Sequence, residues 1–141
     1  MKIETTPQLD FHNVLIRPKR TTISSRSQVN LNRKFKFLYS KQTWTGVPII
    51  AANMDTTGTF GVYDVLSKHK TITCLNKFYG VQHFKNRWEN GEPLNPDYFM
   101  ISTGIDERNF SNLNDIVEYT KCKFLCIDVA NGYMQQLVKF C

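Results

Sequence analysis

Hydrophobic and polar positions follow two different patterns along the chain, and the change falls at about Val47. Before it no period is sustained, and Pro18 with the polar runs TTISSRS and NLNRKF predicts loops. The runs FHNVLI and KFKFLY in the same region are typical of short strands. We therefore expect a loosely structured extension over residues 1–46 and a regular domain over residues 47–141.

Four short apolar runs follow, each typical of a strand covered on both faces, as in a parallel sheet. They are VPIIAAN (47–53), TITCLN (71–76), YFMIST (98–103) and KFLCIDVA (123–130). Helical periodicity separates them and continues after the last one. The predicted helical faces are Val62, Val65, Leu66 and His69; Val81, Phe84 and Trp88; Phe110, Leu113, Ile116 and Val117, with Asp106 as N-cap; and Met134, Leu137, Val138 and Cys141.

This alternation predicts an α/β fold in which the strands recur about every 25 residues. Eight such units make about 200 residues, the size of a (β/α)8 barrel core, so the chain would supply the first four βα units of a TIM barrel. A doubly wound Rossmann-like sheet is the other topology that the order allows. The last helical pattern ends at Cys141 without a stop signal or a following strand, which predicts a truncated half-barrel.

Composition supports a packed domain, since 41% of the 141 residues are hydrophobic and 13% are aromatic. The net charge of +6 is unevenly placed: residues 11–54 carry eight Lys and Arg and no Asp or Glu. This segment could meet a phosphate-bearing ligand, nucleic acid or an acidic protein surface, or it could be a solvated basic extension. No signal peptide and no apolar run of about 18 residues is found, so we expect no membrane span and a cytoplasmic location.

The four cysteines do not form a metal-binding pattern. Cys122 and Cys126 form C-x-x-x-C, but no second Cys or His pair completes a site, so we expect reduced thiols and no metal. The phosphate-binding motifs G-x-x-x-x-G-K-[ST] and G-x-G-x-x-G are absent from the sequence.

Candidate chemistry lies where the predicted strands end, because ligands of parallel α/β folds bind at the carboxyl ends of the strands. The four segments are Asn53-Met54-Asp55-Thr56, Asn76-Lys77, Ser102-Thr103-Gly104 and Asp128-Val129-Ala130-Asn131-Gly132. Asp55 and Asp128 can accept hydrogen bonds from ribose hydroxyls, and Lys77 can pair with a phosphate. Gly104 and Gly132 allow a ligand to approach the backbone. Each segment could instead only cap the next helix, but four together favour a site rim.

Three stretches carry a family resemblance: LDFHNVLIRPKRTTISSRSQVNLNRKF, SKQTWTGVPIIAANMDTTGTF and FLCIDVANGY. They resemble the IMP dehydrogenase/GMP reductase family, and AANMDT followed by GTF, with DVANGY, is most similar to its GMP reductase branch. The resemblance implies a (β/α)8 barrel, a homotetramer and NADPH-dependent deamination of GMP to IMP with release of ammonia. It also implies GMP and IMP as ligands, with no nucleic acid or membrane partner.

The resemblance assigns cofactor-binding roles residue by residue. Lys77 matches a lysine that contacts NADP, and the run Asp128, Val129, Ala130 matches a strand end that binds the cofactor. Ser25 and Arg26 match a pair that reaches the cofactor of a neighbouring subunit. The remaining candidates, expected at the rim of the site, are Asp55, Ser102, Gly104, Asn131 and Gly132.

The chain also departs from the family pattern. The usual His-Lys-His reads Asn76-Lys77-Phe78, and Thr57 stands where Val is usual. The resemblance places the catalytic cysteine, its threonine, the potassium loop and the GMP phosphate loops beyond Cys141, so no catalytic residue is assigned and the isolated chain is expected to be inactive. An inactive half-barrel that associates with full-length subunits is the main alternative, and nucleic-acid binding through residues 17–41 is a weaker one.

Overall fold

The computed structural model describes residues 3–106 and 110–141. The chain forms two compact units, Met1–Asn30 and Leu31–Cys141. In the first, every described residue is exposed, and two short 3-10 helices interrupt an extended backbone: η1 (Phe11–Asn13) and η2 (Arg26–Gln28). The strand predicted for FHNVLI is therefore wrong, because Asp10 caps a helical turn at Phe11. Ser25 caps η2 in the same way, accepting a hydrogen bond from the backbone N–H of Ser27.

The second unit begins with an antiparallel hairpin, β1 (Arg33–Lys36) and β2 (Thr43–Gly46). Phe35 lies opposite Trp44, and their rings stack with centroids 6.1 Å apart. Trp44 is buried, and its Nε1 donates to the carbonyl of Asp97, 2.8 Å away. The hairpin thus belongs to the same compact unit as the sheet. The expected boundary between an N-terminal extension (1–46) and a regular domain (47–141) stays a prediction.

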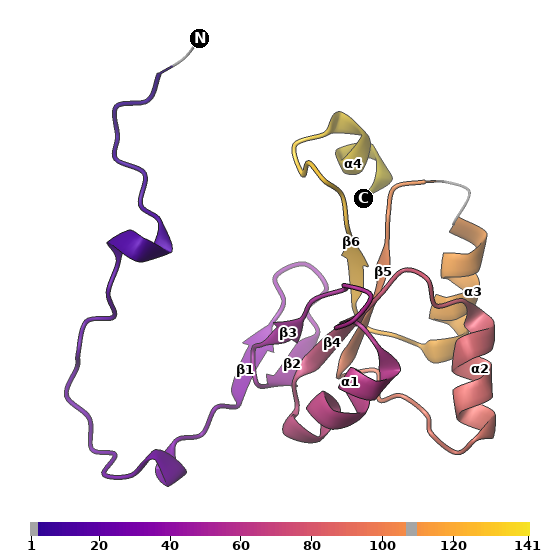
Figure 1. The fold of residues 1–141 in the computed structure, drawn as a ribbon, viewed down its shortest axis with the longest axis horizontal. Helices are drawn as coiled ribbons and strands as arrows, with labels where there is room; N and C mark the ends of the chain where they lie inside the picture. Colours follow the sequence, from indigo (N-terminus) through magenta and orange to yellow (C-terminus); the bar gives the residue numbers. More distant parts are fainter. Residues whose placement is uncertain (1–2, 107–109) are drawn as a thin grey trace. The chain divides into compact units, whose positions relative to one another are not determined.

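A four-stranded parallel sheet forms the centre of this unit, in the order β3-β4-β5-β6 (Figure 1). Its strands are β3 (Ile50–Ala51), β4 (Ile72–Leu75), β5 (Phe99–Thr103) and β6 (Leu125–Ile127). The helices between and after them are α1 (Phe60–Leu66) with η3 (Ser67–His69), α2 (Val81–Glu89), α3 (Phe110–Thr120) and α4 (Gln135–Phe140). The α/β alternation predicted from the sequence is confirmed, and a parallel sheet in this order is consistent with part of a barrel.

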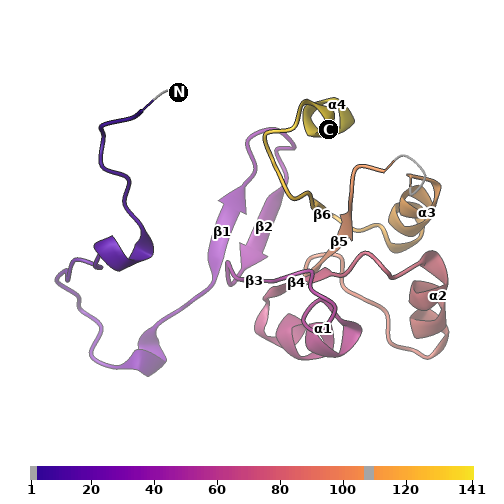
Figure 2. The ribbon, with the colours of Figure 1, turned by 45° about the horizontal axis from the view of Figure 1, so that its top comes forward.

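Helices α1, α2 and α3 cover one face of the sheet, as two views of the ribbon agree (Figure 2). Their buried side chains join those of β4 and β5 in one core: Tyr63, Leu75, Phe84, Phe99, Ile101, Leu113 and Ile116. A doubly wound sheet carries helices on both faces, so this one-sided cover favours the barrel topology. The predicted face of α1 is wrong in part: Val62 and Leu66 are half-buried, but Val65 and His69 are exposed. Tyr63, which was not predicted, is the buried residue of the helix.

The sheet is strongly curved. Asn53 follows β3 and Asp128 follows β6, so the two residues belong to opposite edges of the sheet. In a flat sheet the ends of these strands would lie about 14 Å apart, because neighbouring strands are about 4.8 Å apart. Yet Asn53 Nδ2 donates to Asp128 Oδ2 at 3.0 Å. The strands must therefore curl toward one another at their carboxyl ends, as they do in a barrel wall.

Candidate functional site

The turn after β3 is held against the end of β4 by close backbone packing. A Cβ placed on Gly58 would lie 2.4 Å from the carbonyl oxygen of Cys74 and 3.0 Å from the Cα of Asn53. Asn76 fastens the same turn, since its backbone N–H and its Nδ2 both donate to the Gly58 carbonyl, at 2.9 and 3.0 Å. This turn carries Asp55, which is exposed. Its expected place at the rim of a site stays a prediction.

Asn76 has a structural role that the sequence did not indicate. Its side-chain oxygen accepts a hydrogen bond from the backbone N–H of Phe78 at 3.1 Å, while its amide holds Gly58. A carboxamide at this position therefore joins the β3 turn to the β4 turn. The sequence showed only that Asn stands where the resemblance has His, and the hydrogen bond to Gly58 depends on the packing of the two turns.

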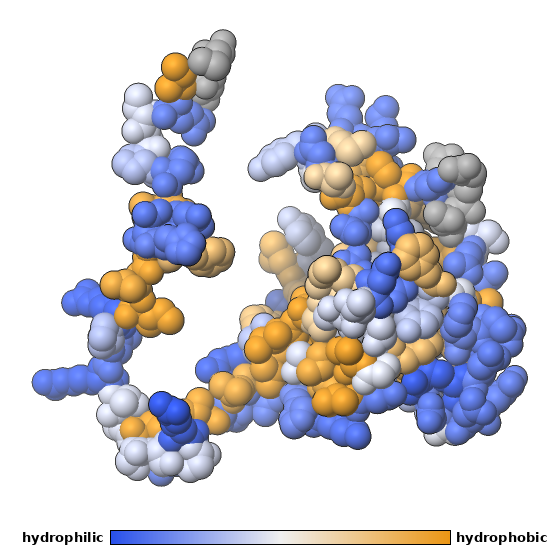
Figure 3. All heavy atoms as spheres, viewed as in Figure 1, coloured by the Kyte–Doolittle hydropathy of each residue, from blue (hydrophilic) through white to orange (hydrophobic). Residues whose placement is uncertain are grey.

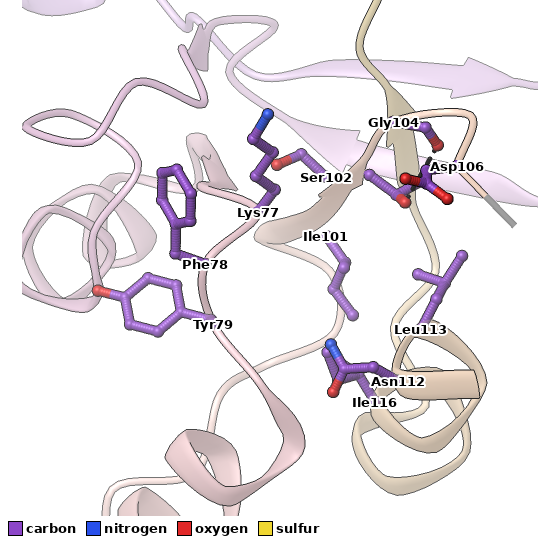
Figure 4. A pocket seen from close by; sticks show the side chains of 11 residues that line it. Lys77, Phe78, Tyr79, Ile101, Ser102, Gly104, Asp106, Asn112, Leu113 and Ile116 are labelled. Carbon is purple, nitrogen blue, oxygen red and sulfur yellow. Dashed lines mark hydrogen bonds between the residues drawn. The ribbon is translucent and has the colours of Figure 1, made fainter. Parts of the chain in front are cut away.

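A cavity of about 360 Å³ opens beside the ends of β4 and β5 (Figure 4). Lys77, Phe78 and Tyr79 lie on one side of it, and Asn112, Leu113 and Ile116 of α3 lie opposite. Ser102, Gly104 and Asp106 lie between them at the end of β5. The structure thus brings the predicted residues Lys77, Ser102 and Gly104 to one cavity.

Lys77 and Phe78 form an exposed cationic and aromatic pair at the mouth of this cavity. Lys77 Nζ lies 5.7 Å from the centroid of the Phe78 ring, and Phe78 is 67% exposed. A cation beside an open aromatic face suits a ligand that combines negative charge with a planar ring. A nucleotide has both features.

Ser102 contributes to the cavity wall more than to a ligand site. Its side chain is buried, and its hydroxyl donates to the carbonyl of Leu75 at 2.6 Å. Gly104 is different, because among the described residues no atom outside its immediate chain neighbours lies within 4 Å of the position a Cβ would take. A ligand can therefore approach the backbone of Gly104 closely.

Asp128 is held by contacts to the ends of two other strands, the neighbouring β5 and the far edge strand β3. Its backbone N–H donates to the Thr103 carbonyl at 2.7 Å, and its carboxylate accepts the hydrogen bond from Asn53. The side chain of Asp128 is not among those that line the cavity of Lys77. Val129, Ala130, Asn131 and Gly132 follow directly, and Asn131 accepts a hydrogen bond from the backbone N–H of Tyr133.

Ser25 and Arg26 lie in the other unit, where Ser25 is the N-cap of η2 and Arg26 is its first residue. Both are exposed, so their side chains are accessible to a partner. Their predicted contact with the cofactor of a neighbouring subunit stays a prediction.

Two of the thiols, those of Cys74 and Cys122, are poorly placed as nucleophiles. Burial raises the pKa of Cys74 to about 12, and Cys126 and Asp128 nearby act in the same direction. Burial also raises the pKa of Cys122, against hydrogen bonds from Thr120 and Phe124 that lower it. Among residues 3–106 and 110–141 there is no group of three or more His, Cys, Asp or Glu that could hold a metal ion. No helix in these ranges is long and apolar enough to cross a membrane.

A second, apolar cavity of about 230 Å³ lies at the opposite end of the strands, where they begin. The hairpin covers it from one side, and Phe37 packs edge-on against Phe124 with ring centroids 5.9 Å apart. Its lining is Phe35, Phe37, Trp44, Pro48, Ile49, Ile50, Ile72, Met100 and Phe124. Figure 3 shows hydrophobic side chains gathered over the hairpin and β3, where Ile49 and Ile50 are more than half exposed.

Comparison with known proteins gives a consistent set of relatives. The chain is 43% identical to GMP reductase of Caenorhabditis elegans over 140 residues, which are 99% of this chain and 39% of that protein. It is 45% identical to GMP reductase of Photobacterium profundum over 141 residues, 41% of that protein. The chain thus spans about two fifths of the length of the curated relatives that it matches. No protein-family model matches it.

A solved structure supports the fold. The inosine 5′-monophosphate dehydrogenase of Legionella pneumophila superposes with a TM-score of 0.69 at 21% identity, over 92% of this chain and 38% of that one. The resemblance indicated by AANMDT and DVANGY is confirmed for the part of these proteins that the chain spans.

Proposed function

We propose that this chain, a relative of GMP reductases in the IMP dehydrogenase/GMP reductase family, supplies part of the NADP site of an enzyme that deaminates GMP to IMP. The 43% identity to a GMP reductase over 140 residues carries the proposal. The wider assignment is an NADPH-dependent oxidoreductase of purine nucleotide metabolism, cytoplasmic and tetrameric, that releases ammonia.

The residues at the strand ends fit such a cofactor. Lys77 presents a cation at the mouth of the 360 Å³ cavity, which suits a phosphate of NADP. Asp128 presents an exposed carboxylate that can accept hydrogen bonds from ribose hydroxyls. Val129 and Ala130 follow it at the strand end, and Ser25 and Arg26 are proposed to reach the cofactor of a neighbouring subunit, where Arg can hold a phosphate bidentately.

The isolated chain is proposed to bind NADPH without reducing GMP. None of Cys74, Cys122, Cys126 and Cys141 matches the motif of the family nucleophile, and the buried Cys74 thiol stays protonated at neutral pH. The potassium site and the GMP phosphate site are proposed to lie outside this chain.

Titration of the purified chain with NADPH, followed by nicotinamide fluorescence, tests the proposal. We expect saturable binding that Lys77→Ala weakens about tenfold, the loss of one charge-assisted contact. Lys68→Ala, which removes an exposed lysine of η3, is the matched control and should leave the affinity unchanged. Absence of NADPH binding would contradict the cofactor role, and GMP-dependent oxidation of NADPH by residues 1–141 would contradict the predicted inactivity.

The exposed sheet edges favour a second candidate, an inactive half-barrel that associates with complete subunits. Ile50 on β3 is 53% exposed and Leu125 on β6 is 44% exposed, and these strands form the two edges of the sheet. Unpaired edges of this kind can accept further strands. Co-elution with a full-length GMP reductase in size-exclusion chromatography would support this candidate. A stable monomer that elutes separately from the full-length enzyme would count against it.

A further inference from the structure

We infer that Asn53 is a positioning residue for Asp128: its side-chain amide holds the Asp128 carboxylate at the angle at which it meets the ribose of the cofactor. The inference rests on the proposed NADP site and adds to it a residue from the far edge of the sheet. Asn53 and Asp128 are 75 positions apart in sequence and joined by one hydrogen bond of 3.0 Å.

The chemistry of the pair fixes which group donates. A carboxylate has no proton to give at neutral pH, so the Asn53 amide must present its NH₂ group to Asp128. The bond is charge-assisted, and such bonds are about twice as strong as neutral ones. It occupies Oδ2 of Asp128, and no hydrogen bond from the described residues reaches Oδ1. One carboxylate oxygen is thus held by the protein while the other remains available to a ligand hydroxyl.

Both partners are anchored independently of this bond. The Asp128 backbone is hydrogen-bonded to Thr103 on β5. Asn53 lies in the turn that Gly58 packs against β4 and that Asn76 fastens. Neither backbone depends on the side-chain bond for its place, so losing the bond should free the rotation of the carboxylate without displacing the strand ends.

The ligand-binding consequence is tested with a double-mutant cycle on the complete chain. We expect Asn53→Ala to weaken NADPH binding about fivefold or more, since an exposed carboxylate then rotates freely. In the Asp128→Ala background the same change should have almost no further effect, because Asn53 acts through Asp128. Asn86→Ala is the matched control: this exposed asparagine of α2 also makes a side-chain hydrogen bond, but it lies away from the strand ends.

The exchange variant Asn53→Asp with Asp128→Asn separates positioning from simple stabilisation. It restores an amide–carboxylate hydrogen bond but moves the charge from the end of β6 to the end of β3. We expect the melting temperature to recover toward the wild-type value while NADPH affinity stays low. Recovery of affinity together with the melting temperature would overturn the positioning role.

Melting temperatures of the single and double alanine variants, measured without NADPH, test the pair apart from the cofactor. Non-additive shifts are expected for groups in direct contact, and additive shifts would overturn the inference even if the wild-type chain binds NADPH. Equal effects of Asn53→Ala on affinity with and without Asp128 would also overturn it. If the wild-type chain binds no NADPH, the proposed function fails and the ribose role fails with it, whereas non-additive shifts would still support the contact.

Discussion

Gly58 has no room for a side chain larger than hydrogen. A Cβ there would lie 2.4 Å from a backbone oxygen of β4 and 2.9 Å from the backbone nitrogen of Asn76, and neither can move without breaking the turn. The residue therefore sets how closely the β3 turn approaches β4, and through that turn it sets the position of Asn53.

Gly58→Ala should lower the free energy of unfolding by about 2 kcal/mol, because overpacked backbone must shift. Gly61→Ala is the control in the same segment, since the nearest atom to its added Cβ is 4.0 Å away and alanine favours a helix. Urea unfolding followed by circular dichroism measures both. Equal stability of Gly58→Ala and the wild-type protein would contradict the close packing of the turn.

The buried Cys74 thiol should make the protein less stable as the pH rises into the alkaline range. Its pKa is about 12 in the folded chain against 9.0 for an unperturbed thiol, so the unfolded chain releases this proton first. The stability that the buried thiol contributes is present in full below pH 9.0 and is lost as the pH rises toward 12. Between these values the wild-type protein should lose stability more steeply than Cys74→Ala, as measured by urea midpoints across the pH series. Parallel curves for the two proteins would show that Cys74 is not the titrating group.

The sequence predicted those parts of the candidate site that follow directly from where the strands end. Lys77 and Gly104 meet at one cavity because neighbouring parallel strands end at the same edge, which is a rule of the fold. The link between Asn53 and Asp128 depends on how far the sheet curls, and no local pattern encodes that. Ser102 looked available for a ligand, but its hydroxyl is used by the Leu75 carbonyl.

At the scale of single elements, α1 and α2 are joined by a charged contact beside the core. Arg87 of α2 donates two hydrogen bonds to the carboxylate of Asp64 on α1, at 2.6 and 3.2 Å, and its guanidinium lies 4.9 Å from the centroid of the Phe60 ring. The Arg87 side chain is only 13% exposed. This geometry fixes the spacing of two helices that cover the sheet.

Arg87→Ala should destabilise the protein by about 2 kcal/mol, since charge-assisted bonds and a partly buried ring contact are lost together. Lys123→Ala, which removes an ion pair to Asp97 whose partners are both well exposed, should cost no more than about 0.5 kcal/mol. Thermal and urea unfolding of both variants provide the comparison. A larger loss for Lys123→Ala than for Arg87→Ala would reverse the assigned order.

The elements that sequence predicts best are the ones that are buried on both faces. β4 is buried along its whole length and falls within the predicted run TITCLN, and β5 lies within YFMIST. β2 was missed because only Trp44 and Gly46 are buried in it, too little for a recognisable pattern. β3 is much shorter than its apolar run, because it is an edge strand paired on one side only.

At the scale of the whole molecule, the two units differ in what holds them together. All described residues of the first unit are exposed, and its two 3-10 helices rely on side-chain caps such as those of Asp10 and Ser25. The second unit contains the buried aromatic and aliphatic core. The folding free energy of the chain therefore resides in residues 31–141.

Removal of residues 1–30 should leave the melting temperature of the remaining chain within about 2 °C of the intact protein, a change that corresponds to a fraction of a kcal/mol. Differential scanning calorimetry of the two chains measures this directly. A much lower melting temperature for residues 31–141 would show that the first unit contributes to the core.

The strand order carries a consequence for how the protein is made. In the sheet β3-β4-β5-β6, each strand after β3 pairs with the strand before it in the chain. The two strands of each pair are connected by one helical segment: α1 with η3, α2 or α3. Each strand of this sheet after β3 therefore finds its partner already synthesised when it emerges from the ribosome, and no pairing within the described sheet waits for a distant segment. The order of translation is also an order in which the sheet can assemble, one βα unit at a time.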